Sequence, residues 1–217
     1  MVKRATICAL GSPPHFHGDA YDADPIAHRL YDAAGHAGYG AVLLSGDGVR
    51  DLPIRSLVKT QLDGLGPGDE FLFGWVGHGG REDGFDEWPT GYLVTADERE
   101  RLEDWELQRL LLPAAARGVK VLAILEACSS GGFLVPDREL PAGDVPPVFE
   151  TVRSRVVCIT SSSDVATSTV GLVDELLARR ADNPQSYREL HRALDERWSG
   201  KPCLSGPRDL LDGPRWF

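Results

Sequence analysis

A cysteine and a histidine stand in this sequence where they could act together as a nucleophile and its proton-transfer partner. Cys128 ends an apolar, β-branched run that begins at Val119 and stops at Cys-Ser-Ser-Gly-Gly. His78 ends a similar run that begins at Asp69 and closes with Gly-His-Gly-Gly. Such runs predict buried strands, and the small residues after them allow the backbone to turn sharply beside a ligand. A thiol and an imidazole that meet there suit nucleophilic acyl transfer.

The strands that must position these two residues are predicted to be parallel neighbours. The carboxyl ends of parallel strands meet at one edge of a sheet, and this is where open α/β folds place their sites. A free thiol has a pKa of about 8.5, so Cys128 needs an acid/base partner or an electropositive setting. We expect His78 to polarise the thiol and to pass a proton to a leaving amine.

The two motifs resemble the active-site motifs of the caspase-like cysteine peptidases, the clan of caspases, metacaspases and legumain. The histidine of the caspase signature also lies about 50 residues before the cysteine. The resemblance is closest to bacterial metacaspase- or orthocaspase-type catalytic domains and covers roughly residues 69–165 well. The residues that carry it are Gly77-His78-Gly79, Glu126-Ala127-Cys128-Ser129-Ser130-Gly131, the acidic segment 82–87, the strand 92–97, Asp104-Trp105-Glu106-Leu107 and Gly118-Val119-Lys120.

This resemblance implies a cysteine endopeptidase with a Cys128–His78 dyad. It also implies that the backbone N–H groups of Gly79 and Cys128 stabilise the tetrahedral oxyanion. Glu126 lies two residues before Cys128 and therefore projects to the same side of a strand. The metacaspase branch carries an acid at this position and cleaves after Arg or Lys, so Glu126 is predicted to bind substrate. Asp22 loosely matches a second acid of the same pocket.

Two other functions remain open on these residues. The string Glu-Ala-Cys-x-Ser-Gly at 126–131 is also similar to the legumain-like asparaginyl peptidases, which have a related fold and a different preference. A non-catalytic relative that keeps the fold as a binding or scaffold module is the second alternative, and the presence of both His78 and Cys128 argues against it. The chain also has Cys-Ser-Ser-Gly where the family usually has Cys-His-Ser-Gly, and Val76 where a serine is common; both differences could change the substrate pocket.

Acidic residues between the two motifs raise the question of a calcium site. Many metacaspases are activated by calcium through acids in this region, and carboxylates are the ligands that calcium prefers. The candidates are Asp83, Asp86, Glu87, Asp97 and Asp104. A solvated acidic loop is the alternative, and Trp105 favours it because it replaces an acid that the family often has. No cofactor is expected to be required.

Composition limits the classes of partner. The chain has 217 residues and a formal net charge of −10, which argues against nucleic acid or an anionic membrane and leaves a protein or peptide substrate. One domain is expected, with a large-subunit-like part over about 1–135, a loop over 136–154 and a small-subunit-like part over 155–217. No segment resembles a signal peptide or a membrane span, and the cysteines lack metal spacing, so we expect a cytoplasmic protein with reduced thiols. The oligomeric state is left open.

The order of predicted elements gives the fold class. Strands are expected over 4–10, 41–45, 69–76, 119–127 and 155–160, with a last edge strand over 202–205. Helices are expected from Asp24-Pro25, over 54–65, over 104–112 with a stop at Pro113, over 165–177, and from 183 onward. This alternation predicts a caspase-like three-layer α/β sandwich, a mostly parallel sheet with helices on both faces. The serines at 161–163 are interpreted as a loop that, by the resemblance, lies near the substrate cleft.

Overall fold

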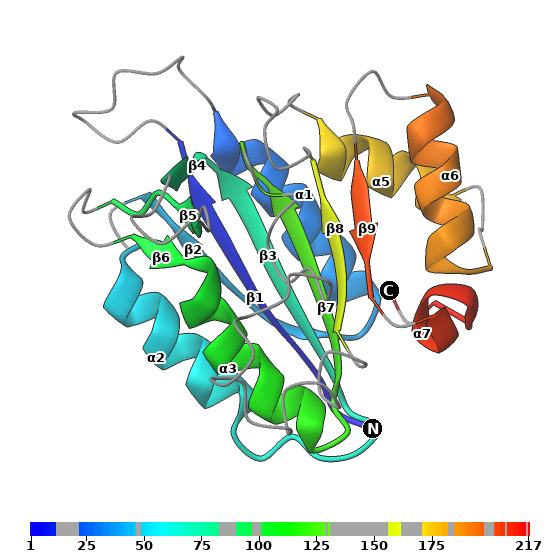
Figure 1. Cartoon of the computed structure of the whole chain (residues 1–217), viewed down its shortest axis with the longest axis horizontal. Helices are drawn as coiled ribbons and strands as arrows, with labels where there is room; N and C mark the ends of the chain where they lie inside the picture. The colour runs from blue at the N-terminus through cyan, green and yellow to red at the C-terminus, as the bar shows by residue number, and fades with distance from the viewer. Residues whose placement is uncertain are drawn as a thin grey trace.

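The fold is built on one six-stranded sheet, which this computed structural model places between two layers of helices (Figure 1). Its strand order is β2-β1-β3-β7-β8-β9; five strands run parallel, and β9 runs antiparallel to β8. The strands are β1 (Lys3–Leu10), β2 (Gly40–Ser45), β3 (Glu70–Gly77), β7 (Lys120–Glu126), β8 (Val156–Thr160) and β9 (Cys203–Ser205).

The structure describes most of the chain, in several ranges. These are residues 1–11, 22–46, 49–82, 90–96, 101–128, 130, 156–161, 171–181, 185–197, 202–206, 208–215 and 217. The loop predicted over 136–154 lies outside them. Within the part of the chain that the structure describes, no helix is long and apolar enough to cross a membrane.

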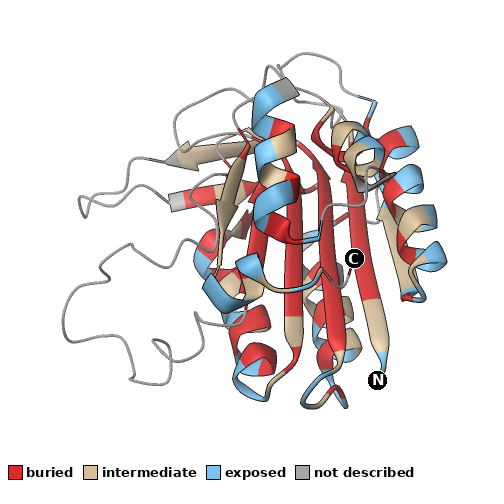
Figure 2. Ribbon diagram, turned by 90° about the vertical axis from the view of Figure 1, so that its right-hand side faces the viewer, coloured by how far each residue is buried: buried red, intermediate tan, exposed pale blue. Residues whose placement is uncertain are grey.

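Helices cover both faces of the sheet, and Figure 2 shows their buried sides turned toward the strands. One face carries α1 (Ala23–His36), α5 (Leu172–Ala181), α6 (Tyr187–Arg197) and the short α7 (Arg208–Asp212). The other face carries α2 (Asp51–Leu62) and α3 (Asp104–Ala116). The predicted three-layer, mostly parallel α/β sandwich is confirmed, and so is the edge strand near the C-terminus.

Strand β3 is buried along its whole length because helices cover both of its sides. Phe73 and Trp75 pack toward α2 and α3, while Leu72 and Val76 pack toward α1, α5 and α6. This double burial explains why the strand reads as a continuous apolar run rather than as an alternating one. The glycine in its middle, Gly74, makes room for α1, because a Cβ there would stand 2.8 Å from Leu30 Cδ2.

A second, three-stranded antiparallel sheet follows β3. The resemblance indicated only one of its strands, over 92–97, and the structure places that strand at Thr90–Leu93. The sheet consists of β4 (Gly79–Glu82), β5 (Thr90–Leu93) and β6 (Leu102–Glu103), in the order β4-β5-β6. Its strands have two to four residues each, which is too short for a recognisable periodicity in the sequence. Leu93 and Leu102 anchor it in the core beneath α2 and α3.

Several helix boundaries differ from those predicted. Helix α2 spans 51–62 rather than 54–65, and α5 continues to Ala181, past the predicted end at 177. Helix α1 begins at Ala23, one residue before Asp24, so Pro25 lies within its first turn, where a missing N–H costs nothing. Helix α3 continues through Pro113 to Ala116 instead of stopping before the proline. Pro113 lies on the exposed side of α3, as does Arg109, whose carbonyl loses its helical partner. Water can satisfy that carbonyl, so the helix tolerates the proline in its last turn.

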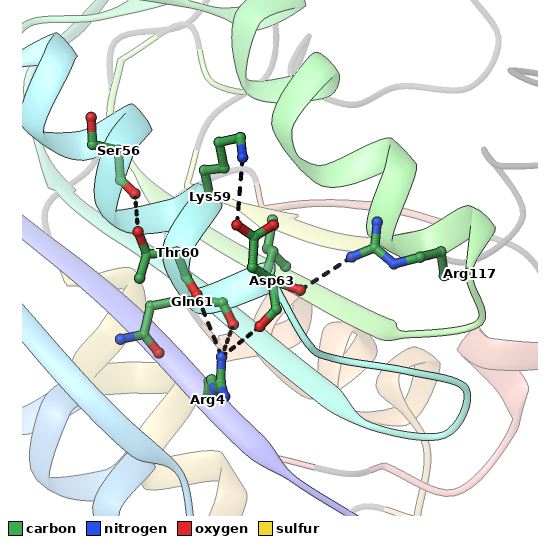
Figure 3. A network of polar contacts seen from close by, with 8 residues as sticks. Arg4, Ser56, Lys59, Thr60, Gln61, Asp63 and Arg117 are labelled. Atoms are coloured by element: carbon green, nitrogen blue, oxygen red, sulfur yellow. Dashed lines mark hydrogen bonds and ion pairs between the residues drawn. The ribbon is translucent and has the colours of Figure 1, made fainter.

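Two arginines from other elements bind the C-terminal carbonyls of α2 (Figure 3). Arg4 Nη1, from β1, donates to the carbonyl oxygens of Gln61 and Asp63, both at 2.9 Å, and to that of Thr60 at 3.4 Å. Arg117 Nη2 donates to Leu62 O at 3.1 Å. The last carbonyls of a helix lack helical partners and carry partial negative charge, so both cations stabilise this end.

We expect Arg4→Met to lower the free energy of unfolding by about 1–2 kcal/mol, because it removes these hydrogen bonds while keeping a long apolar side chain. Lys59→Met is the matched control. Lys59 forms only an exposed ion pair with Asp63, at 3.4 Å, so its loss should change stability by less than about 0.5 kcal/mol. Urea denaturation of both variants tests this, and equal losses would contradict a capping role for Arg4.

Candidate active site

The register between β3 and β7 places His78 and Cys128 at neighbouring strand ends. The two strands pair in parallel from Glu70 with Lys120 to Val76 with Glu126, so each residue of β3 lies beside the residue 50 positions later. His78 and Cys128 are separated by the same 50 positions, and each lies two residues beyond its strand's last pair. The 50-residue spacing between His78 and Cys128 therefore equals the offset between paired residues of β3 and β7.

Contacts of Gly79 show that the two strand ends touch. A Cβ on Gly79 would lie 2.5 Å from Cys128 O and 3.0 Å from Ala127 Cβ. No side chain fits at that position, because the nearest atom belongs to the backbone of the cysteine turn. The residue after the histidine is thus packed directly against the cysteine, as the sequence motifs implied.

His78 and Cys128 are only partly buried at the ends of their strands. His78 O accepts a hydrogen bond from Val94 N at 3.1 Å, which fixes the histidine's backbone to the end of β5. Burial lowers the pKa of His78 below its ordinary value of 6.5, so the imidazole is neutral at neutral pH. A neutral imidazole is able to accept the proton of a thiol.

The other described thiols are less suited to attack. Burial raises the pKa of Cys8 to about 12 and also raises that of Cys158, and both side chains are fully enclosed in the core. Such thiols stay protonated and unreactive. Cys203 is half-buried on β9, at the edge of the sheet. Cys128 alone among these four follows the carboxyl end of a central strand.

Glu126, predicted as a substrate-binding acid, is hydrogen-bonded to the beginning of α5. Its side chain is 1% exposed, and its two carboxylate oxygens accept hydrogen bonds from Gly171 N at 3.0 Å and Val173 N at 2.8 Å. These amides belong to the beginning of α5, where backbone N–H groups lack helical partners. Glu126 therefore caps α5, and a substrate cation would have to share this carboxylate with the two amides.

Asp22, the second predicted substrate-binding acid, lies in a different environment. It immediately precedes α1, its side chain is exposed, and it makes no capping hydrogen bond to that helix. Its carboxylate is therefore available to solvent, whereas that of Glu126 is enclosed.

Ser161 contacts the residue before the nucleophile; the sequence indicated a loop there that, by the resemblance, lies near the substrate cleft. Ser161 follows the last residue of β8 and is 1% exposed. Its Oγ accepts a hydrogen bond from Ala127 N at 3.1 Å and donates one to Ala127 O at 3.2 Å. Ala127 is the residue before the cysteine. The sequence did hold a signal for this contact, because Ser161 directly follows β8, the strand that pairs with β7.

The predicted calcium ligands are mostly outside the described residues; this holds for Asp83, Asp86, Glu87 and Asp97. Asp104 is the first residue of α3, is largely buried, and accepts a hydrogen bond from Gln108 Nε2 at 2.9 Å. Among the residues that can be described, no three histidine, cysteine or acidic side chains form a group able to hold a metal ion. Calcium activation stays a prediction.

Two curated proteins, both metacaspases, are similar in sequence to this chain. Metacaspase-1B and Metacaspase-1A of Aspergillus clavatus are 23% and 26% identical to the chain, over 158 and 156 residues. Each match covers 65% of this chain, and 35% and 34% of the relatives, so the chain spans about a third of the length of the curated relatives it matches. No family model matches the chain.

Two solved structures share the architecture. Protein GSU0716 from Geobacter sulfurreducens superposes with a TM-score of 0.70 at 22% identity, covering 99% of this chain and 98% of that one. Caspase-1 from Spodoptera frugiperda superposes with a TM-score of 0.69 at 13% identity, covering 98% and 88%. The chain therefore has the caspase-like α/β fold.

The capping role of Glu126 leads to a stability prediction. We expect Glu126→Gln to lower the free energy of unfolding by about 1–3 kcal/mol, because an amide has one acceptor oxygen for two buried N–H groups and loses the charge at the helix N-terminus. Glu189→Gln is the matched control. Glu189 accepts from Gln185 N at 2.8 Å, near the beginning of α6, but at an exposed position, so its loss should cost less.

Urea or thermal denaturation of the two variants measures this difference. Equal stability of Glu126→Gln and the wild type would show that the carboxylate is not needed to hold α5.

Proposed function

We propose that this protein is a cysteine endopeptidase in which Cys128 is the nucleophile and His78 its proton-transfer partner. The observation that carries the proposal is the β3–β7 register, which sets both residues beyond adjacent strand ends, with Gly79 against the Cys128 backbone. The half-buried thiol can be reached from solvent, and the neutral imidazole suits it as a base. Similarity to metacaspases supports the same reaction.

The reaction would proceed through an acyl-enzyme. The sulfur of Cys128 bonds to the carbonyl carbon of the scissile peptide, and the thiol proton passes to His78. The carbon–nitrogen bond then breaks, and the leaving amine takes that proton from the imidazolium. Water attacks the resulting thioester, with His78 removing its proton. The carbon–sulfur bond then breaks, the proton passes from the imidazolium to the sulfur, and the carboxylic acid product leaves.

Backbone amides would stabilise the charge that develops on the carbonyl oxygen. The candidate donors are Gly79 N and Cys128 N, which lie on the two touching strand ends. Donors fixed before the reaction stabilise an oxyanion without reorganising during it, and removing one typically costs about 10²- to 10³-fold in rate. The absence of a Cβ at Gly79 lets its backbone lie against Cys128 O, so the two candidate donors are held near each other.

We further propose cleavage after Arg or Lys. The support comes from the resemblance to metacaspases, from the carboxylate of Glu126 two residues before the nucleophile, and from the exposed carboxylate of Asp22. The capping bonds of Glu126 leave its negative charge in place near the strand end, and this charge attracts a cationic side chain and repels an acidic one. Direct contact would require Glu126 to bind substrate and α5 at once.

The dyad is tested by Cys128→Ala and His78→Ala. Each is expected to reduce peptide cleavage to background, at least about 10³-fold, because the nucleophile or its proton carrier is lost. Circular dichroism should remain unchanged. Cys203→Ala is the matched control and should keep full activity, since Cys203 lies on the edge strand β9. Full activity in either dyad variant would overturn the assignment.

The specificity is tested with a positional peptide library. We expect cleavage after Arg and Lys and none after Asp. In Glu126→Gln and Asp22→Asn, kcat/KM should fall more for peptides with Arg than for peptides with norleucine, an uncharged side chain of similar length. A variant that loses activity equally on both peptides has a general defect, and its acid does not select the cation. A preference for Asn would favour a legumain-like peptidase, and a preference for Asp would contradict the metacaspase-like proposal.

A further inference from the structure

The backbone of Ala127 lies where the regular pairing of the sheet ends. Pairing of β7 with β3 stops at Glu126, and pairing with β8 stops at Leu125. Ala127 is nevertheless 1% exposed, so its N–H and C=O groups need partners inside the protein. The backbone of Ser161 adds one more ladder bond, from Ser161 N to Leu125 O at 3.0 Å.

The hydroxyl of Ser161 then serves both polar groups of Ala127. It accepts from Ala127 N at 3.1 Å and donates to Ala127 O at 3.2 Å. A hydroxyl has one donor and two acceptor sites, so a single side chain is able to make both bonds. In effect, the serine side chain extends the β7–β8 ladder by one residue while the chain turns toward Cys128.

The bond to Ala127 O also acts on the next amide. Ala127 C=O and Cys128 N–H belong to one peptide unit, which is planar and trans, so the two groups point in opposite directions. Fixing the carbonyl toward Ser161 therefore fixes the Cys128 N–H away from it. A hydrogen bond accepted by an amide carbonyl also polarises the amide and makes its N–H a stronger donor.

We propose that Ser161 is a positioning residue that orients and polarises the Cys128 N–H as an oxyanion donor. Ser161 does not contact substrate in this role; it acts through the Ala127–Cys128 peptide unit. The inference rests on the proposed peptidase function and identifies a residue of the C-terminal part of the chain that completes the nucleophile's environment. It also explains why a buried polar side chain stands directly beside the nucleophile turn.

The kinetic test is Ser161→Ala, with peptide cleavage and stability measured together. Because the oxyanion forms only in the transition state, kcat and kcat/KM should fall by the same factor, about 10- to 100-fold, with KM unchanged. Ser186→Ala is the matched control. Ser186 is a buried serine whose Oγ accepts from Glu189 N at 3.2 Å, at the start of α6, so its loss should lower stability and leave kcat unchanged.

A second readout separates the oxyanion from the reactivity of the thiol. With a peptide aldehyde, the Cys128 sulfur bonds to the aldehyde carbon, and the π electrons move to the oxygen, which takes a proton; this tetrahedral adduct uses the oxyanion donors. Iodoacetamide alkylates the sulfur with loss of iodide and forms no oxyanion. Ser161→Ala should therefore weaken aldehyde inhibition by the factor lost in kcat and leave the alkylation rate of Cys128 unchanged.

The outcomes distinguish this inference from the proposed function. A folded Ser161→Ala enzyme with full kcat, or with equal losses toward the aldehyde and iodoacetamide, would overturn the role of Ser161 while leaving the peptidase intact. If the alanine variant does not fold, Ser161→Cys, which keeps a side chain of similar size but hydrogen-bonds only weakly through sulfur, provides the same comparison. A loss toward the aldehyde alone supports the role of Ser161, and equal losses toward the aldehyde and iodoacetamide overturn it. A wild-type protein that cleaves no peptide in the library would instead remove the proposed function.

Discussion

The parallel pairing of β3 with β7 is the interaction on which the rest of the site depends. Both strands are buried on their two faces, so a slip of one residue would turn apolar side chains away from their helices and bring others against the wrong layer. Packing on both sides therefore fixes the register, and the register fixes which residues meet at the strand ends. The half-buried histidine and cysteine are placed beyond neighbouring strand ends by this core packing.

Beyond the last paired residues, the site relies on groups that replace the lost sheet ladder. Gly79 allows one strand end to approach the carbonyl of Cys128, and Ser161 binds both polar groups of Ala127. Glu126 binds the first amides of α5. Each of these contacts meets the same requirement, because backbone groups at the end of a strand or helix cannot remain buried without partners. The nucleophile turn is consequently held by residues from both halves of the chain, on either side of the segment 131–155.

Composition alone does not reveal which acidic side chains are buried or what they bind. The chain has a formal net charge of −10, and a solvated surface is the ordinary reason for such a value. Glu126 and Asp104 are nevertheless buried, one bound to a helix N-terminus and the other to Gln108. A carboxylate accepts hydrogen bonds from several donors at once, so it can organise backbone amides as well as attract cations. For Glu126, the structure shows the first of these properties, in the hydrogen bonds to the beginning of α5.

The sequence by itself determined the alternation of strands and helices, the mostly parallel sheet and the placement of His78 and Cys128 beyond neighbouring strand ends. These follow from local signals, since apolar runs mark buried strands and glycines mark the turns that end them. The continuation of α3 through Pro113, the short sheet β4-β5-β6, the capping by Glu126 and the contacts of Ser161 were decided by the tertiary structure. The physical reason is that each depends on which backbone groups remain unpaired once distant elements have packed, and the residues that satisfy them, such as Ser161 for Ala127, lie far away in the chain.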